Sequence, residues 1–235
     1  VTIIGDPDET ARIRRGLSRG RTGIRWSADR VEHTIRLTEL SGHAPLADLA
    51  RRIRVAHGLI VVVRADGRDA ARAESILRVA DDHQVARLCL VTGLDHPAAD
   101  FDRCVRAVAG IRGAVPLVVH SPLGLGEDFA GRIDLVPMWS LEPMATEFFG
   151  SHWSQAEQRF RDLVGTALEH DTTGDPREIP TGDLHDRIRH LTRIGEAVPV
   201  LCDAAPTSDD TAPLLDAIVR YLPSPLHVCQ PEHTL

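Results

Sequence analysis

The chain has 235 residues and a formal net charge of −7, with 43% hydrophobic and 26% charged residues. These values are typical of a globular protein with one large domain, or with one domain that carries an insertion. No run approaches the roughly 18 apolar residues of a membrane-spanning helix, and the acidic charge argues against broad binding to DNA or anionic membranes. We therefore expect neither a membrane nor DNA as a partner.

The first half of the chain alternates short apolar segments with amphipathic segments. The run GLIVVV at Gly58–Val63 is typical of a central parallel strand. Asp8 is expected to cap an arginine-rich helix that ends near Ser18. The other expected strands are Val1–Gly5, His33–Leu40, Arg87–Thr92 and Leu117–His120, and the other expected helices are Pro45–His57, Asp69–Gln84 and Ala98–Ile111. This alternation predicts βαβ units in a doubly wound, mostly parallel α/β sheet.

The pattern changes after Ser121 and resumes near the end of the chain. Residues 122–138 suggest a loop and a short hairpin, and helices are expected at Trp153–His170 and Gly182–Ala197. A strand at Val198–Ala204 and a helix at Ala212–Leu222 then return to the α/β pattern. We therefore predict an α/β domain from residues 1–121 plus 197–235, with an inserted α+β subdomain over 122–196.

Cysteines and aromatic residues give only broad indications. No CxxC pair occurs, so we expect buried free thiols at Cys89 and Cys202 and a reducing cytoplasm rather than a disulfide framework. Several aromatic residues gather in the insertion, where they form either a small core of its own, which we favour, or an apolar face for a partner. They are Trp139, Phe148, Phe149, Trp153 and Phe160.

Two segments resemble the GTP-binding domain of elongation factor G. They are VPVLCDAAPTSDDTAPLLDAIVRYLPSPLHV, which begins at Val198, and SPLGLGEDFAGRIDLV, which begins at Ser121 at the start of the predicted insertion. The stretch His57–Asp95 follows the same family. The resemblance implies a P-loop GTPase fold with an inserted subdomain, GTP or GDP with Mg²⁺ as ligands, and a role in translation at the ribosome.

The phosphate-binding loop of that family is degenerate here. Its pattern, GxxxxGKS/T, needs a lysine, and all 27 basic residues of this chain are arginines. Counted from Gly5, the lysine position holds Ala11; an alignment on Asp6 instead puts Glu9 there and keeps Thr10 as a Mg²⁺ ligand. The carboxylates of Asp6, Asp8 and Glu9 would then face the polyphosphate. One carboxylate about 4 Å from a phosphate oxygen repels it by roughly 4 kcal/mol at an effective dielectric near 20.

The two switch motifs survive only in fragments. Arg19–Thr22 is the nearest match to the first switch, where Thr22 would reach Mg²⁺, although an ordinary loop is the interpretation we favour. The second switch keeps Gly42, which would sense the γ-phosphate, and His43, which would orient the attacking water. The simpler alternative is a glycine turn between a strand and a helix. Glu39 stands where the family has its metal-binding aspartate.

The guanine-recognition loops are also partly preserved. The resemblance places Thr92–Asp95 in the base-binding loop, where the Asp95 carboxylate would accept hydrogen bonds from guanine. It places Ala204 and Ala205 at the second base contact, beside the added negative charge of Asp203. Asp95 could equally serve as a loop or helix-cap carboxylate.

These residues favour a pseudo-GTPase that has lost catalysis and acts by binding a partner. The partner expected from the resemblance is the ribosome or another translation factor, with the insertion as a candidate contact surface. The alternative is a divergent GTP- or GDP-binding protein or slow GTPase in which Arg12 or Arg14 replaces the missing lysine.

Overall fold

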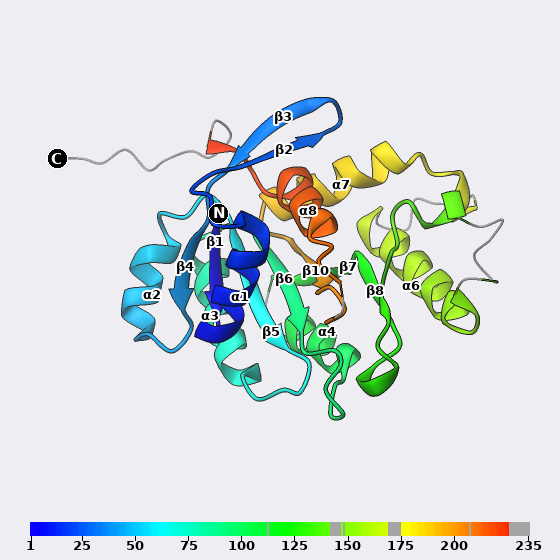
Figure 1. The fold of residues 1–235 in the computed structure, drawn as a ribbon. Coiled ribbons are helices and arrows are strands. Elements are labelled where there is room, and N and C mark those ends of the chain that lie inside the picture. Colours follow the sequence, from blue (N-terminus) through cyan, green and yellow to red (C-terminus); the bar gives the residue numbers. More distant parts are fainter. Residues whose placement is uncertain (112, 142–146, 148, 169–174, 207, 226–235) are drawn as a thin grey trace.

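The computed structural model describes residues 1–111, 113–141, 147, 149–168, 175–206 and 208–225. Its centre is a parallel sheet in the order β4-β1-β5-β6-β10-β7 (Figure 1). Every neighbouring pair in this sheet is parallel. The strands are β1 (Thr2–Gly5), β4 (Thr38–Ser41), β5 (Leu59–Arg64), β6 (Arg87–Thr92), β7 (Val115–Val118) and β10 (Ala197–Cys202). The predicted α/β class with a mostly parallel sheet is confirmed.

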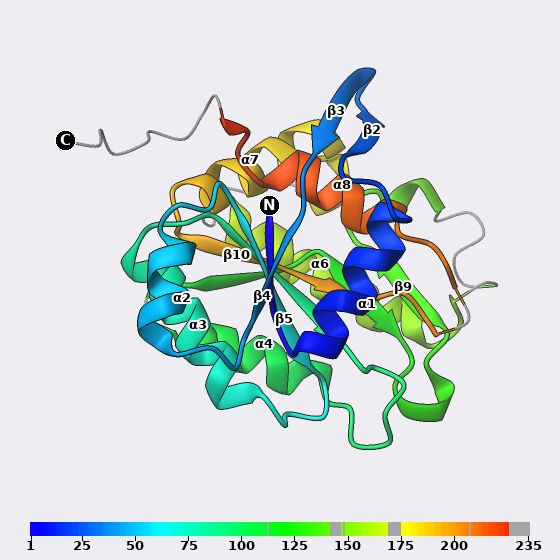
Figure 2. The same cartoon turned by 60° about the vertical axis from the view of Figure 1, so that its left-hand side comes forward.

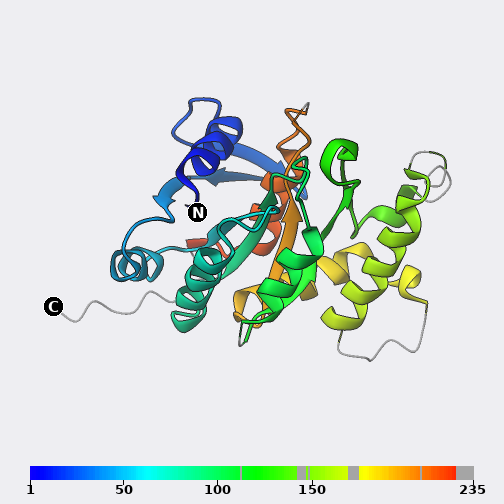
Figure 3. The ribbon, with the colours of Figure 1, turned by 90° about the horizontal axis from the view of Figure 1, so that it is seen from below.

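Helices cover both faces of the sheet because alternate strand residues are apolar on each side. In β5, Ile60 and Val62 join one hydrophobic cluster, whereas Leu59 and Val61 join the other. The first cluster is covered by α1 (Pro7–Ser18), α6 (His152–Ala167), α7 (Thr181–Arg193) and α8 (Ala212–Tyr221). The second is covered by α2 (Leu46–Ile53), α3 (Ala70–Asp82) and α4 (Phe101–Ala109), which lie along the other side of the sheet in Figure 3.

Two local predictions in the first half of the chain were wrong. The expected strand His33–Leu40 is interrupted at Arg36 and Leu37. Its first part is β3 (Val31–Ile35), which pairs antiparallel with β2 (Ile24–Ala28), and its second part is β4 at the sheet edge. The strand β2 was not expected. Figure 2 shows β2 and β3 as a ribbon that projects from the body, so only one side of it is packed and its sequence signal is weak.

The cap of α1 also differs from the prediction. The helix begins at Pro7, and its N-cap is Asp6 rather than Asp8, which lies inside the first turn. Proline suits the first helical position because that N–H has no partner within the helix.

The expected strand Leu117–His120 is also divided between two sheets, as the expected strand His33–Leu40 is. Its first residues belong to β7, and His120 instead begins β8 (His120–Leu123), which pairs antiparallel with β9 (Gly131–Asp134). Val119 separates the two strands, which belong to different sheets. A hairpin is therefore present in this region, but its first strand begins at His120 and the loop lies between its two strands instead of before them.

The aromatic residues of the predicted insertion pack on one another. Trp139 meets Trp153 and Phe160 edge to face, each with ring centroids 5.6 Å apart, and Phe149 stacks on Trp153 at 6.0 Å. Phe148 lies outside the described residues. These rings join the hydrophobic cluster of the sheet and α8, so they form a core rather than a free apolar face.

Cys89, Cys104 and Cys202 are buried free thiols, as expected for the two predicted positions. Within the described ranges, no helix has the length and apolar character that crossing a membrane requires.

Candidate functional site

The turn between β1 and α1 is the shortest strand-to-helix connection at the carboxyl edge of the sheet. Only Asp6 separates Gly5, the last residue of β1, from Pro7, the first residue of α1. The Asp6 side chain accepts hydrogen bonds from the backbone N–H groups of Asp8 and Glu9 at 3.0 and 3.2 Å. The Asp6 carbonyl accepts the Thr10 N–H at 2.9 Å.

In this geometry, the backbone N–H groups with which a P-loop binds phosphate are already bonded within the turn. A helix N-terminus binds an anion through its free N–H groups. Here Pro7 has no N–H, and the next three N–H groups are bonded to Asp6. A P-loop also has four residues between its two glycines, whereas here the helix begins two residues after Gly5 and Thr10 stands at the position of the second glycine. The carboxylate of Asp6 therefore occupies the position of the anion.

Gly5 and Gly42 are required by close packing. A Cβ on Gly42 would lie 2.8 Å from the Gly5 carbonyl oxygen, and a Cβ on Gly5 would lie 2.8 Å from Cβ of Val62. The Gly42 N–H, which the resemblance assigns to the γ-phosphate, donates to the Gly5 carbonyl at 2.6 Å. The close contact of β1 with the turn after β4 accounts for both glycines without a nucleotide.

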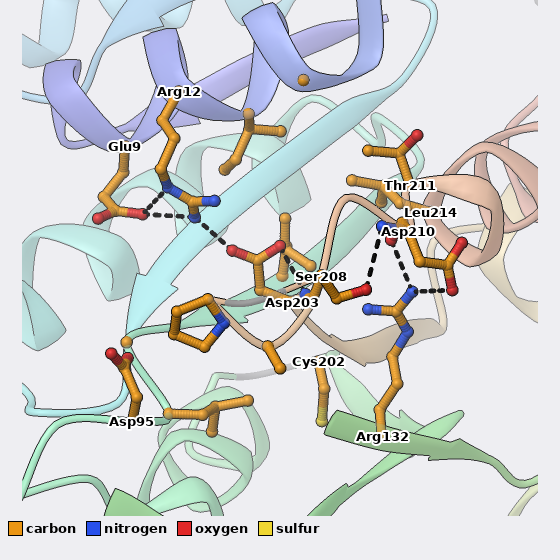
Figure 4. A pocket seen from close by; sticks show the side chains of 18 of the residues that line it. Glu9, Arg12, Asp95, Arg132, Cys202, Asp203, Ser208, Asp210, Thr211 and Leu214 are labelled. Carbon is orange, nitrogen blue, oxygen red and sulfur yellow. Dashed lines mark hydrogen bonds and ion pairs between the residues drawn. The ribbon is translucent and has the colours of Figure 1, made fainter. Parts of the chain in front are cut away.

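A chain of ion pairs joins α1 to the ends of two strands, and Figure 4 shows its part between Glu9, Arg12 and Asp203. Glu9 pairs with Arg12 at 2.8 Å and with Arg64, at the end of β5, at 3.2 Å. Arg12 also pairs with Asp203, which follows β10. Arg12 is therefore bound to two carboxylates in the place where the alternative hypothesis needed a free cation.

The network continues from Arg64 to Asp66. The Asp66 carboxylate accepts hydrogen bonds from Arg64 at 3.0 Å and Arg68 at 2.7 Å. Burial by itself raises the pKa of Asp66, but the hydrogen bonds from these two arginines outweigh it and hold the pKa far below its usual range. The carboxylate stays ionised at any physiological pH.

The predicted metal ligands do not come together. The Thr10 hydroxyl is buried and donates to the Pro7 carbonyl at 3.0 Å. Thr22 is exposed and follows the opposite end of α1, a 12-residue helix that is about 18 Å long at 1.5 Å per residue. Glu39 pairs with Arg14 at 2.7 Å. The described residues contain no cluster of three or more His, Cys, Asp or Glu side chains that could hold a metal.

His43 is exposed at the start of the segment between β4 and α2. Its backbone N–H donates to the Ser41 hydroxyl at 3.2 Å, and Arg72 donates to the carbonyl oxygens of Gly42 and Ala44. These bonds fix the turn as local structure. Among the described residues, the His43 imidazole has no partner that could serve as a general base or a general acid.

The predicted base-binding residues do line one cavity. A pocket of about 960 Å³ lies between α1, the loops after β6 and β10, and the N-terminus of α8 (Figure 4). Asp95, Ala204 and Ala205 all border it, with Ile13, Leu90 and Leu214 as part of its apolar wall. Asp95 is exposed. Thr92 is fully buried at the end of β6, and its hydroxyl finds no hydrogen-bond partner in the part of the chain that the structure describes.

Two cations of this edge were not among the predicted site residues. Arg64 and Arg132 both line the pocket, and Arg132 pairs with Asp210 at 3.2 Å. Arg64 directly follows the predicted strand Gly58–Val63. The carboxyl end of that strand lies on the same edge as the turn after β1, and this is a signal that could have placed Arg64 at the site. Arg132 lies in a hairpin whose position relative to the sheet only the tertiary structure shows.

The parallel sheet with helices on both faces defines a doubly wound α/β domain. Over residues 13–224 the chain matches the family described as the elongation factor Tu GTP binding domain, and it belongs to that family. The predicted relationship to translational GTPases is thereby confirmed.

A crystal structure of a protein from Thermus thermophilus shares this fold. Its TM-score is 0.65 at 17% sequence identity, and the match covers 95% of this chain and 40% of that chain. The present chain therefore spans less than half of the length of that relative. The family match begins at Ile13, so β1 and the turn that carries Asp6 lie before it.

Proposed function

We propose that this translational GTPase-family domain has lost GTP hydrolysis and acts as a binding module. One observation carries the proposal: the turn after β1 is a single residue whose carboxylate bonds the N–H groups that would hold a phosphate. The chain also has no lysine to replace the missing P-loop cation.

Electrostatics adds to the geometric obstacle. Asp6 caps α1, and Asp8 and Glu9 stand within its first turn. Even if solvent reduces each repulsion well below the roughly 4 kcal/mol of a close pair, a few kcal/mol in total lowers affinity by several powers of ten. Mg²⁺ cannot compensate, because Thr10 and Glu39 are bonded elsewhere. The residues present do not fit the metal, so no hydrolytic step is derived through it.

Isothermal titration calorimetry with GTP and with GDP, each at millimolar concentration with Mg²⁺, tests this proposal. We expect no binding heat and no rise in melting temperature. A ligand at 100 times its Kd would stabilise the protein by about 2.7 kcal/mol, so thermal melting gives an independent measurement. Binding at micromolar concentration would overturn the proposal.

The open pocket supports a second candidate function, the recognition of a guanine base without its phosphates. Asp95, Ala204 and Ala205 converge on this pocket from two loops. If it binds guanosine, Asp95→Ala should abolish the preference for guanosine over adenosine. Asp209→Ala removes a different carboxylate from the wall of the same pocket and is the matched control. An unchanged preference in Asp95→Ala rules out this role.

The partner that family membership suggests is the ribosome or another translation factor, in a reducing cytoplasm that suits three buried free cysteines. Because α6 and α7 share a hydrophobic cluster with the sheet, the whole chain is the proper reagent rather than a deletion of residues 122–196. Cosedimentation with ribosomes at low salt supports this assignment, and its absence counts against it.

A further inference from the structure

The central sheet has a free edge at β7. This strand pairs with β10, and no strand in the described part of the chain lies on its other side (Figure 1). The N–H groups of Val115 and Val119 donate to carbonyl groups in or next to β10, each at 3.0 Å. Because successive residues of a strand direct their backbone groups to opposite sides, the N–H and carbonyl groups of Val118 point away from β10. This edge can therefore bond to a further strand.

A proline limits what this edge can pair with. Pro116 also directs its backbone away from β10, but it has no N–H to donate. A proline on an edge strand hinders open-ended pairing between sheets, while its carbonyl group still accepts a hydrogen bond. The edge therefore offers one donor, on Val118, and two acceptors, on Pro116 and Val118. With so few backbone bonds, an added strand also needs contacts from its side chains.

A groove of about 650 Å³ beside this edge has room for such side chains. Val115 and Leu117 of β7 line one wall of the groove, and residues of α6 line the facing wall. Val115 is 45% exposed, so part of this apolar wall is not covered by the protein. Gly165 widens the groove on the α6 side, because a Cβ there would meet no atom within 4 Å. The groove can therefore take apolar side chains of an added strand.

Two carboxylates of this groove have no ion pair. Asp162 and Glu196 both line the groove and are exposed, and neither forms an ion pair within the described residues. The amide of Gln158 donates to Asp162 at 3.0 Å, but this neutral group leaves the charge uncompensated. Arg161 also lines the groove, and it is paired with Glu157 at 3.9 Å. A cationic side chain is therefore attracted to the groove, and an anionic one is repelled.

We propose that this groove binds an extended peptide segment of a partner protein, with alternating apolar side chains and at least one arginine or lysine. The peptide adds to β7 as a strand, its apolar side chains contact Val115 and Leu117, and its cation pairs with Glu196. The groove lies at the amino ends of β7 and β10, whereas the 960 Å³ pocket lies at the carboxyl edge of the sheet. Peptide binding therefore does not depend on whether the nucleotide site is functional.

Selection of a phage-displayed library of random peptides against the full chain tests the chemistry of the occupant. We expect the enriched peptides to carry valine, isoleucine or leucine at alternate positions and at least one basic residue. Enrichment of acidic or proline-rich peptides, or no enrichment at all, would overturn the proposal.

Fluorescence anisotropy with one enriched and labelled peptide then tests the location. Gly165→Leu fills the groove and should lower affinity at least about tenfold. Gly182→Leu is the matched control, because its Cβ also meets no atom within 4 Å but the residue lies outside the groove. It should change affinity less than about twofold. The melting temperature should not fall in either variant, and equal affinities of the two would exclude the groove as the site.

Glu196→Gln tests the charge of the groove. It should weaken binding of the same peptide by about two- to fivefold at low salt, because an exposed ion pair contributes modestly. Glu127→Gln removes an exposed carboxylate from the loop between β8 and β9 and is the control, which should leave the affinity unchanged. Equal losses in the two variants would mean that net charge, rather than the groove, attracts the peptide.

Methylation of the peptide's backbone nitrogens tests strand addition. A strand bonds to its neighbour through every second residue, so methylation of one alternate set should abolish binding while methylation of the other set should not. Equal effects of the two sets would rule out a strand. These titrations contain no nucleotide, so peptide binding and the proposed loss of GTP binding can fail separately.

Discussion

The carboxyl edge of the sheet has a closed side and an open side. After β1, one residue leads into α1, and its carboxylate bonds N–H groups of that helix; the Glu9–Arg12–Asp203 ion pairs run from α1 to the loop after β10, along the wall of the pocket. After β6 and β10, longer loops leave a pocket of about 960 Å³. Both sides rest on the same parallel strands, so the sheet does not depend on the loops above it. The length of each loop decides whether a ligand can enter.

This difference shows how a nucleotide-binding fold can lose one half of its site. The hydrophobic strands and their helices do not depend on the loops above them, because their contacts lie within the two clusters of the core. Phosphate binding, by contrast, needs free N–H groups and a cation in one turn. Shortening that turn removes both without disturbing the sheet.

The largest expected effect concerns the glycines of the closed side. Gly42→Ala should destabilise the protein by about 2 to 3 kcal/mol, because the new Cβ would lie 2.8 Å from a backbone oxygen. Gly165→Ala in α6 meets no atom within 4 Å and should stabilise by about 0.5 kcal/mol. Urea denaturation measures both. A neutral Gly42→Ala would mean that packing does not explain this glycine.

A second prediction concerns the open side, where His120 lies beneath the pocket next to Cys202. Burial lowers the pKa of His120 to about 3, and its Nδ1 atom lacks a hydrogen-bond partner within the described residues. In the unfolded chain the pKa is about 6.5, so protons bind the unfolded state first as pH falls. The stability that neutral His120 contributes to the folded state is fully present above pH 6.5. It is lost progressively as the pH falls toward 3.

His120→Leu should remove this loss. The free energy of unfolding should fall by about 2 kcal/mol less in the variant than in the parent between pH 7 and pH 5. Asp134 acts in the opposite direction, because burial raises its pKa to about 6 and protonation there favours the folded state as pH falls. The comparison of variant with parent cancels that contribution. Parallel pH profiles would show that His120 is not the group responsible.

A third prediction separates the cap from the missing loop on the closed side. Asp6→Ala should cost about 1 kcal/mol of stability because two N–H groups of α1 lose their acceptor, whereas Asp6→Asn should retain most of the cap. Neither variant should acquire GDP binding, since the turn remains one residue long. Binding by Asp6→Ala alone would show that the carboxylate, rather than the loop length, closes this side.

The smallest expected effect concerns the exposed pair Arg14–Glu39. Arg14→Gln should change stability by about 0.5 kcal/mol or less, because the two side chains are 49% and 26% exposed and water screens their attraction. Urea denaturation measures the change. If the free energy of unfolding fell by several kcal/mol, the pair would be a main stabilising contact of the closed side and not a screened surface pair.

Local patterns predicted most of the fold. Buried runs such as Arg87–Thr92 coincide with a strand of the structure, because a strand that is apolar on both faces has an unambiguous signal. The predictions failed where one apparent strand serves two sheets, as at Arg36 and Val119. The strand β2 was missed because its packing partner, α8, lies almost 200 residues away in the sequence.

For the candidate site, the sequence alone determined that a lysine-dependent phosphate site is absent, because composition and motif residues need no three-dimensional information. Only the tertiary structure decided that Asp6 bonds the N–H groups of α1, that Arg12 bridges Glu9 and Asp203, and that Asp95 borders an open pocket. The physical reason is that hydrogen bonds and ion pairs depend on distances of about 3 Å between groups that the sequence separates by up to two hundred residues.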